Sequence, residues 1–234
     1  MSLLTMIGSV ARRVGIAPPT VVAAATDATV LQLLEFAQEE GRQLAHFGDW
    51  RVLRKEKTFT TVAAETQTDT PIPADLGAFI DGTLWNRSRR EPMRGPATPQ
   101  DWQAWKSNST FPIEGVIYLR GTSLLIQPTP NAGETISYEY RSSYWCQSSG
   151  GTAQEAWAAD TDTGILSERL MGLGIIWRFK QSRGMEWQPD FAKYEFEVQQ
   201  ALAADQPRVI VDMAYGGRRD KFPGARPPEG YWQL

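Results

Sequence analysis

Apolar positions recur at helical spacing in two separate parts of the chain. Near the N-terminus, residues 2–14 place apolar side chains on one face of a short helix that can end at Gly15. Two prolines follow, and a second helix is expected from Thr26 or Asp27 to about His46. The N-terminal part therefore predicts a pair of helices.

The second of these helices combines an apolar stripe with a charged face. Its expected inward stripe consists of Val30, Leu34, Ala37, Gly41 and Leu44. Its charged positions are Glu35, Glu39, Glu40 and Arg42. Because these charges lie off the apolar stripe, we expect them on a face that contacts solvent or another protein.

The stretch Ser167–Gly184 predicts a helix that is buried on more than one side. Two apolar stripes run along it, one of Leu170, Leu173 and Trp177 and the other of Met171, Ile175 and Phe179. Such a helix needs several neighbours, so it is expected at the centre of a helical subdomain or between subunits. Gly172 and Gly174 each cost about 1 kcal/mol of helix propensity, which indicates close approach of a neighbour.

The two ends of this helix also carry signals. Ser167 can cap its first turn, and Gly184 can supply the left-handed residue that ends it. Pro189 and Asp190 then favour a new helix that runs to Asp205. The two helices together predict a helical hairpin.

Between residues 50 and 146 the period changes from helical to alternating. The stretch GVIYLRGTSLLIQP, at residues 115–128, predicts a β-hairpin whose register stays open. Residues 134–141 alternate almost perfectly, which predicts a strand with one packed and one wet side. The packed side is expected to carry Ile136, Tyr138 and Tyr140. Thr98 and Pro99 predict the start of a short helix.

These elements predict an α+β fold, a helical bundle with an antiparallel β insertion and an extended C-terminal arm. The bundle combines the N-terminal helix pair with the C-terminal helical hairpin. We expect residues 1–49 and 164–206 to form the helical subdomain, residues 50–146 the β-rich insertion, and residues 147–163 a loop.

Residues 207–234 form the predicted arm, which has four prolines, four glycines and no sustained period. Its apolar residues are Val209, Ile210, Val211, Met213, Tyr215, Phe222, Tyr231 and Trp232. A purely solvating tail would not carry them. The mixture favours an interaction arm that orders on a partner.

Composition adds three limits. The net charge of −3, from 24 basic and 27 acidic residues, disfavours a reader of duplex DNA. Cys146 is the only cysteine, which excludes an intrachain disulfide and fits a reducing compartment. No run approaches the roughly 18 apolar residues of a membrane span, so no membrane partner is expected.

Nine tryptophans favour assembly, because aromatic residues are common in interface cores.

The sequence offers no catalytic constellation. His46 is the only histidine and lies at a helix end, where compensating the helix dipole is its more common role. Asp160–Gly164 begins like a calcium loop, but it lacks the later ligands, so a turn with Asx hydrogen bonds is expected. Trp102 and Trp105 are suited to stacking a sugar, although burial in a small helix is the simpler interpretation. We therefore predict no catalytic residue, metal or cofactor.

The order of several segments resembles that of the head-to-tail adaptor, or connector, proteins of short-tailed bacteriophages. The segments are the N-terminal helix pair, DGTLWNRSRREP, GPATPQDWQAWK, the GVIYLRG hairpin, ETISYEYRSSYW and DTDTGILSERLMGLGIIWRFKQSRGM. The resemblance covers roughly residues 1 to 205. None of these segments is the signature of a reactive site.

The resemblance implies a structural virion protein, made in the host cytoplasm and located at the head-tail junction. Such adaptors form a ring, usually of twelve copies, between the portal protein and tail (nozzle or tail-tube) proteins. Double-stranded DNA passes through the ring without sequence recognition. A C-terminal arm often reaches the portal, which implies a portal-binding role for the apolar residues of the arm.

A ring also requires two different faces on each subunit. The candidate residues for this subunit interface are Glu35, Glu39, Arg42, Met171, Ile175 and Phe179. The alternative function is a tail-associated cell-wall hydrolase or a glycan-binding module, which would use the tryptophans to hold glycan.

Overall fold

The computed structural model describes residues 1–69, 71–107 and 115–205. Its helices are α1 (Leu3–Arg13), α2 (Ala28–Phe47), α3 (Pro99–Ser107), α4 (Glu168–Ser182) and α5 (Gln188–Asp205), with a 3-10 helix at Arg51–Leu53. Its strands are β1 (Arg54–Thr60), β2 (Thr66–Gln67), β3 (Leu76–Phe79), β4 (Trp85–Asn86), β5 (Glu91–Pro92), β6 (Val116–Arg120), β7 (Ser123–Gln127), β8 (Thr135–Ser142), β9 (Cys146–Gln147), β10 (Ala153–Gln154) and β11 (Thr163–Gly164). The mixed α+β class is confirmed.

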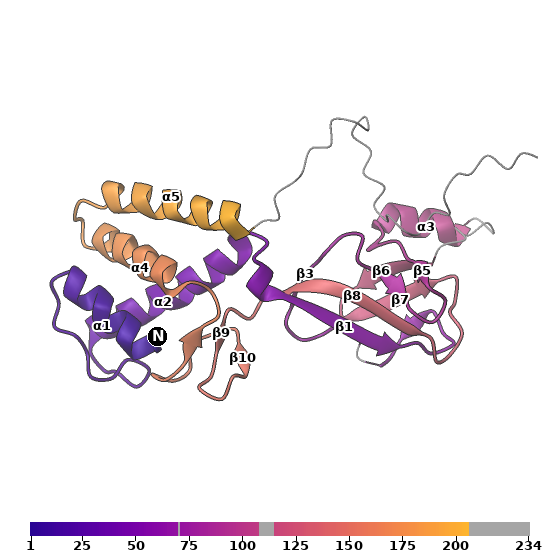
Figure 1. Ribbon diagram of the computed structural model, residues 1–234, viewed down its shortest axis with the longest axis horizontal. Helices are drawn as coiled ribbons and strands as arrows, with labels where there is room; N and C mark the ends of the chain where they lie inside the picture. Colours follow the sequence, from indigo (N-terminus) through magenta and orange to yellow (C-terminus); the bar gives the residue numbers. More distant parts are fainter. Residues whose placement is uncertain (70, 108–114, 206–234) are drawn as a thin grey trace, which may run out of the picture.

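The helices α1, α2, α4 and α5 gather at one end of the molecule, and most strands lie with α3 at the other (Figure 1). Each end has its own hydrophobic cluster. One combines side chains of the four helices with Trp145 and Trp157, and the other is formed within residues 59–140. The proposed domain boundaries stay a prediction.

Helix α4 lies at the centre of the helical part, because it packs against α1, α2 and α5. Both predicted stripes are covered. Leu170, Met171, Leu173, Ile175 and Phe179 are at most 5% exposed, and Trp177 is half-buried. Trp177 packs on Phe191 of α5 with the ring centroids 5.1 Å apart. The interpretation as a core helix is confirmed.

The expected ends of α4 are found at one terminus only. Gly184 has φ of 67°, the left-handed conformation that ends the helix. The Ser167 side chain makes no capping hydrogen bond, so the prediction of a serine cap is wrong. The first turn carries Glu168 instead, whose carboxylate lies 2.6 Å from the N-terminal amine of Met1. A negative charge in the first turn also complements the helix dipole.

The two glycines of α4 have different surroundings. A Cβ atom at Gly174 would overlap the carboxyl group of Glu40 on α2, as expected for a close approach. A Cβ atom at Gly172 would lie 3.8 Å from a Val10 methyl group, which is ordinary contact. Close packing therefore explains Gly174 and leaves Gly172 without a role inside the subunit.

Helix α2 begins after Asp27, whose carboxylate accepts hydrogen bonds from the backbone N–H groups of Thr29 and Val30. One expectation about this helix is wrong. Glu40 is fully buried rather than on the charged face. It lies on the side of α2 that faces α4, and the space left by Gly174 admits its carboxylate.

The largest sheet has the order β1-β8-β4-β5, with β3 also paired to β8. All its pairings are antiparallel. Ile136, Tyr138 and Tyr140 of β8 are buried as predicted. The predicted hairpin is formed by β6 and β7, and its register pairs Arg120 with Ser123.

Asp75 ties the segment before β3 to the neighbouring strands. Its carboxylate accepts hydrogen bonds from Lys55, Tyr140 and Ser142, at 2.7 to 2.9 Å. Burial alone would raise the pKa of this carboxyl, but these hydrogen bonds outweigh burial and lower it. The ionised group therefore stabilises this corner of the sheet.

The segment 147–163, expected as a loop, closes into a small sheet of the order β10-β9-β11 beneath the helices (Figure 1). Its strands have two residues each, too short to leave a period in the sequence. The backbone N–H of Asp162 donates to the carbonyl of Ala159, so the predicted turn is present, but it is not an Asx turn: the Asp162 carboxylate accepts from the N–H groups of Ala158 and Ala159, which precede it. Asp160 accepts from two N–H groups in the connection between α1 and α2.

Replacing Gly174 by alanine is expected to destabilise the chain by about 1–3 kcal/mol. The added methyl group overlaps a buried carboxyl group, and this overpacking exceeds the gain in helix propensity of about 1 kcal/mol. Gly172→Ala is the matched control, and it should leave stability unchanged or raise it. Urea unfolding followed by tryptophan fluorescence measures both, and equal stabilities for the two variants would contradict the packing argument.

Candidate docking surfaces

A buried ion pair joins α2 to α4. Glu40 is 0% exposed and Arg178 is 4% exposed. The Arg178 guanidinium donates to the carboxylate of Glu40, to the side-chain oxygen of Gln43 and, at 3.2 Å, to the carbonyl of Gly174. It also lies over the Trp177 ring, 4.5 Å from the centroid.

Burial raises the pKa of Glu40, because the charged carboxylate loses its hydration, and the Arg178 charge opposes that rise. Burial and the neighbouring Glu40 charge likewise raise the pKa of Tyr194 on α5. Charges removed from water in this way are tolerated only while they stay paired. The contact therefore fixes the position of α2 along α4.

A second face of α2 is exposed. Leu31 is 42% exposed, and Glu35, Glu39 and Arg42 are also exposed. Leu31, Glu35 and Glu39 follow one another at i, i+4 and i+8, so they form a single row, which we call the acidic stripe. Glu35 has no ion-pair partner within the described part of the chain.

A groove of about 260 Å³ lies between α1 and α4, and we call it the α1–α4 groove. Its apolar floor is formed by Met6, Val10 and Gly172, and its polar rim includes Ser9, Arg13, Glu168 and Arg169. Arg169 pairs with Glu197 of α5 at 2.6 Å. Arg13 has no ion-pair partner among the residues that the structure describes. An apolar floor with an arginine rim suits a partner that presents an apolar and an acidic side chain.

A third polar feature lies in the β part, at the turn between β4 and β5. Asn86 starts this turn, and its side-chain oxygen accepts from the backbone N–H of Arg89 at 3.0 Å. Ser88 accepts from the N–H of Thr135 at 2.9 Å. Arg87, Arg89 and Arg90 are exposed, so we call it the arginine turn.

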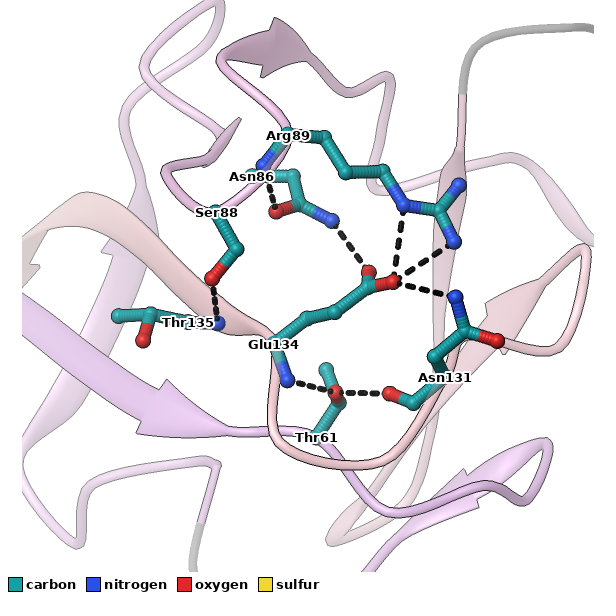
Figure 2. Close-up of polar contacts among 7 residues, drawn as sticks. All are labelled: Thr61, Asn86, Ser88, Arg89, Asn131, Glu134 and Thr135. Atoms are coloured by element: carbon teal, nitrogen blue, oxygen red, sulfur yellow. Dashed lines mark hydrogen bonds and ion pairs between the residues drawn. The ribbon is translucent and has the colours of Figure 1, made fainter.

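Glu134 holds the arginine turn in place (Figure 2). Its carboxylate accepts from Asn86 at 2.6 Å, from Arg89 at 2.8 Å and from Asn131 at 3.0 Å. Burial alone would raise the pKa of Glu134, but the hydrogen bonds from Arg89 and Asn86 outweigh it and lower the pKa. The backbone N–H of Glu134 donates to Thr61, which fixes the acid itself.

The residues predicted for the subunit interface divide into two groups. Glu35, Glu39 and Arg42 are exposed on α2. Met171, Ile175 and Phe179 are at most 2% exposed and lie in the chain's own hydrophobic cluster. Their side chains already pack against other helices of the same chain. The eight predicted residues of the arm, between positions 209 and 232, lie outside the described residues.

Trp102 and Cys146, which the sequence also singled out, are buried inside the protein. Trp102 is fully buried and stacks on Tyr118 with the centroids 5.0 Å apart, as the simpler interpretation predicted. Burial raises the pKa of the Cys146 thiol to about 12. Among the described residues, no group of three or more His, Cys, Asp or Glu side chains is placed to hold a metal ion. Nor does this part of the chain contain a helix long and apolar enough to span a membrane.

The described residues thus form a helical part and a β part, each with its own hydrophobic cluster, and the exposed features named above are candidate docking surfaces. The family model of the SU10 adaptor protein matches residues 1–220, so the chain belongs to the SU10 adaptor protein family. This is a family of structural phage proteins, which makes the chain a bacteriophage adaptor and a virion component with capsid and tail partners. No curated protein matches the chain.

We expect the buried pair to show strong coupling. Arg178→Met or Glu40→Gln alone should cost about 3–5 kcal/mol, because each leaves one buried group without its partner. The double variant should cost clearly less than the sum of the two. Glu39→Gln is the control, since its carboxylate is exposed and 3.6 Å from Arg178, and it should cost less than about 1 kcal/mol. Additive losses in urea unfolding would contradict the coupling.

The contribution of Glu134 should depend on pH. Its lowered pKa means that the stabilisation is present above the usual carboxyl value of 4.5 and is lost as the pH falls through the lower folded value. Glu134→Gln replaces a carboxylate that accepts from three donor side chains by an amide whose N–H₂ group cannot accept a hydrogen bond. The change should lower the free energy of unfolding by about 1–3 kcal/mol at neutral pH. The difference between variant and wild type should shrink on acidification below 4.5.

The control for this measurement is Glu139→Gln, an exposed position of β8, which should change the unfolding free energy by less than about 0.5 kcal/mol at neutral pH. Urea unfolding at a series of pH values gives the comparison. A Glu134→Gln difference that stays constant across the series would show that the charge of Glu134 contributes nothing.

Proposed function

We propose that the chain is a head-to-tail adaptor and that twelve copies form a closed ring below the portal of the phage head, as the family resemblance implies. The ring links the capsid vertex to the tail and surrounds the DNA channel. The observation that carries this proposal is the match to the adaptor family over residues 1–220.

The surface of the helical part supports an assembly role. Large hydrophobic side chains are exposed at Met1, Val21, Leu31, Phe47, Val52, Met185 and Phe196. All of them lie outside β1 to β8, so within the described residues the β part exposes none. Exposed apolar side chains next to charges are typical of protein interfaces. Glu35, Glu39 and Arg42 are the polar part of the proposed subunit contact.

The arm is the proposed contact with the portal, through its apolar residues between Val209 and Trp232. Asp205, the last described residue, accepts from the N–H of Arg51 at 2.6 Å. The arm therefore starts where α2 is joined to the sheet. Segments of this composition can wrap a large surface of a partner, although ordering on it costs conformational entropy.

DNA passage and tail attachment complete the proposal. The net charge of −3 suits a channel through which DNA moves, because a densely basic wall would hold the phosphates. Tail proteins of the nozzle or tail tube are the proposed partners on the far side of the ring.

The experiment compares the full chain with a chain that ends at Gln206. Both are mixed with purified portal rings and analysed by sedimentation and electron microscopy. The full chain is expected to bind as a ring, and the shortened chain to bind at least about tenfold more weakly. Equal binding would rule out the arm as the portal contact. Lysis of cell walls in a zymogram would instead favour the alternative of a tail-associated hydrolase.

A further inference from the structure

The acidic stripe and the α1–α4 groove are two different faces of the helical part. Helix α2 meets α4 at Gly174, where the carboxylate of Glu40 lies. Gly172 is two residues away, which is about 200° around a helix with 3.6 residues per turn. The groove at Gly172 therefore faces away from α2, whereas the stripe is a face of α2 itself, which reaches α4 at Glu39, 3.6 Å from Arg178.

The chemistry of the two surfaces is complementary. The groove has an apolar floor and a rim with Arg13, Arg169 and Glu168, while the stripe has one apolar side chain and two carboxylates. Arg169 and Glu168 are paired within the chain, so Arg13 is the rim charge left for a partner. Arg13 and Glu35 are both exposed, and neither has an ion-pair partner within the described residues. The α4 helix also leaves room in the groove, because Gly172 has no side chain and nothing inside the subunit fills its place.

We propose that the α1–α4 groove of one copy binds the acidic stripe of a second copy. Leu31 of the second copy packs on the floor at Gly172, and Glu35 and Glu39 face the arginine rim. This inference rests on the proposed ring and names its two contacting faces. Because the two faces differ, the contact is heterologous, and its repetition builds a ring where the rotation between copies closes, instead of a two-fold dimer.

A second copy fits the groove better than the C-terminal arm does. Residues 206–234 contain five basic and three acidic residues, so the arm is basic overall. An arginine rim repels a basic segment and attracts carboxylates. The acidic stripe supplies those carboxylates on a helix whose position is fixed by the Glu40 pair.

Disulfide cross-linking tests the contact. Cys146 is fully buried, so we expect cross-links to form only between the engineered cysteines and not through the native thiol. Ser9→Cys lines the groove and Leu31→Cys lies on the stripe. Under mild oxidation, each variant alone should stay uncross-linked, their mixture should give dimers, and the double variant should give a ladder up to the full ring.

Assembly of the wild-type chain is measured in parallel by mass photometry, with and without portal. Rings that form without any Ser9–Leu31 cross-link overturn this inference and leave the proposed function intact. Cross-links within Leu31→Cys alone mean that the stripes meet each other, which also overturns it. A wild-type chain that stays monomeric under both conditions overturns the ring and the inference together.

Two further variants separate the groove from the fold. Gly172→Leu should fill the groove and weaken assembly at least about tenfold without loss of the folded subunit, whereas Gly172→Ala should weaken it less. Arg13→Glu should weaken assembly similarly, and adding Glu35→Arg should restore it. Arg12→Glu, an exposed neighbour outside the groove, is the control. Failure of the Glu35→Arg change to restore assembly of the Arg13→Glu variant contradicts the proposed pairing.

Discussion

The buried contact between Glu40 and Arg178 is the constraint on which the helical part depends. Both charged side chains are buried away from water and must stay paired, so α2 cannot slide along α4 without a large loss of stability. Gly174 makes the contact possible, because any side chain there would occupy the place of the Glu40 carboxylate. The constraint extends to the sheet. Trp50, just after α2, donates to the carbonyl of Leu44, and Arg141 of β8 donates to the carbonyl of Gly48. The position of α2 therefore also sets where the β part begins.

The pattern of apolar residues was enough to predict the long helices, the hairpin β6–β7 and the packed face of β8, because each has a regular helical or strand pattern over several residues. The same pattern predicted the wrong environment for Glu40, which is buried although Glu35 and Glu39, with the same side chain, are exposed. Glu40 differs from the other two glutamates because it lies against Gly174, which is 134 positions later in the chain. A single sequence does not show that Glu40 and Gly174 are in contact. Gly172 and Gly174 looked equivalent for the same reason, although only one of them is required by internal packing.

The polar network of Glu134 and the short strands could not be predicted either. Asn86 and Glu134 are 48 positions apart in the sequence, and their hydrogen bond exists only after β4 and β8 have paired, although Asn131 lies three residues from Glu134. Strands of two residues carry no alternation, since one period needs more positions than they have. The docking surfaces were predictable in part. The charged face of α2 is visible as a spacing, whereas the α1–α4 groove combines residues from the two ends of the described chain.

A closed ring places a geometric demand on each subunit that stability alone does not. In a ring of twelve, successive copies differ by about 30°, and an error of a few degrees at each contact accumulates and prevents closure. The proposed contacting faces lie on α2 and on the α1 side of α4, so the angle between neighbours depends on how α2 sits against α4. A packed apolar contact tolerates small shifts, but a buried ion pair in a glycine-sized space does not. The pair therefore costs hydration energy and in return fixes the relation between the two faces, which is the property that ring closure requires.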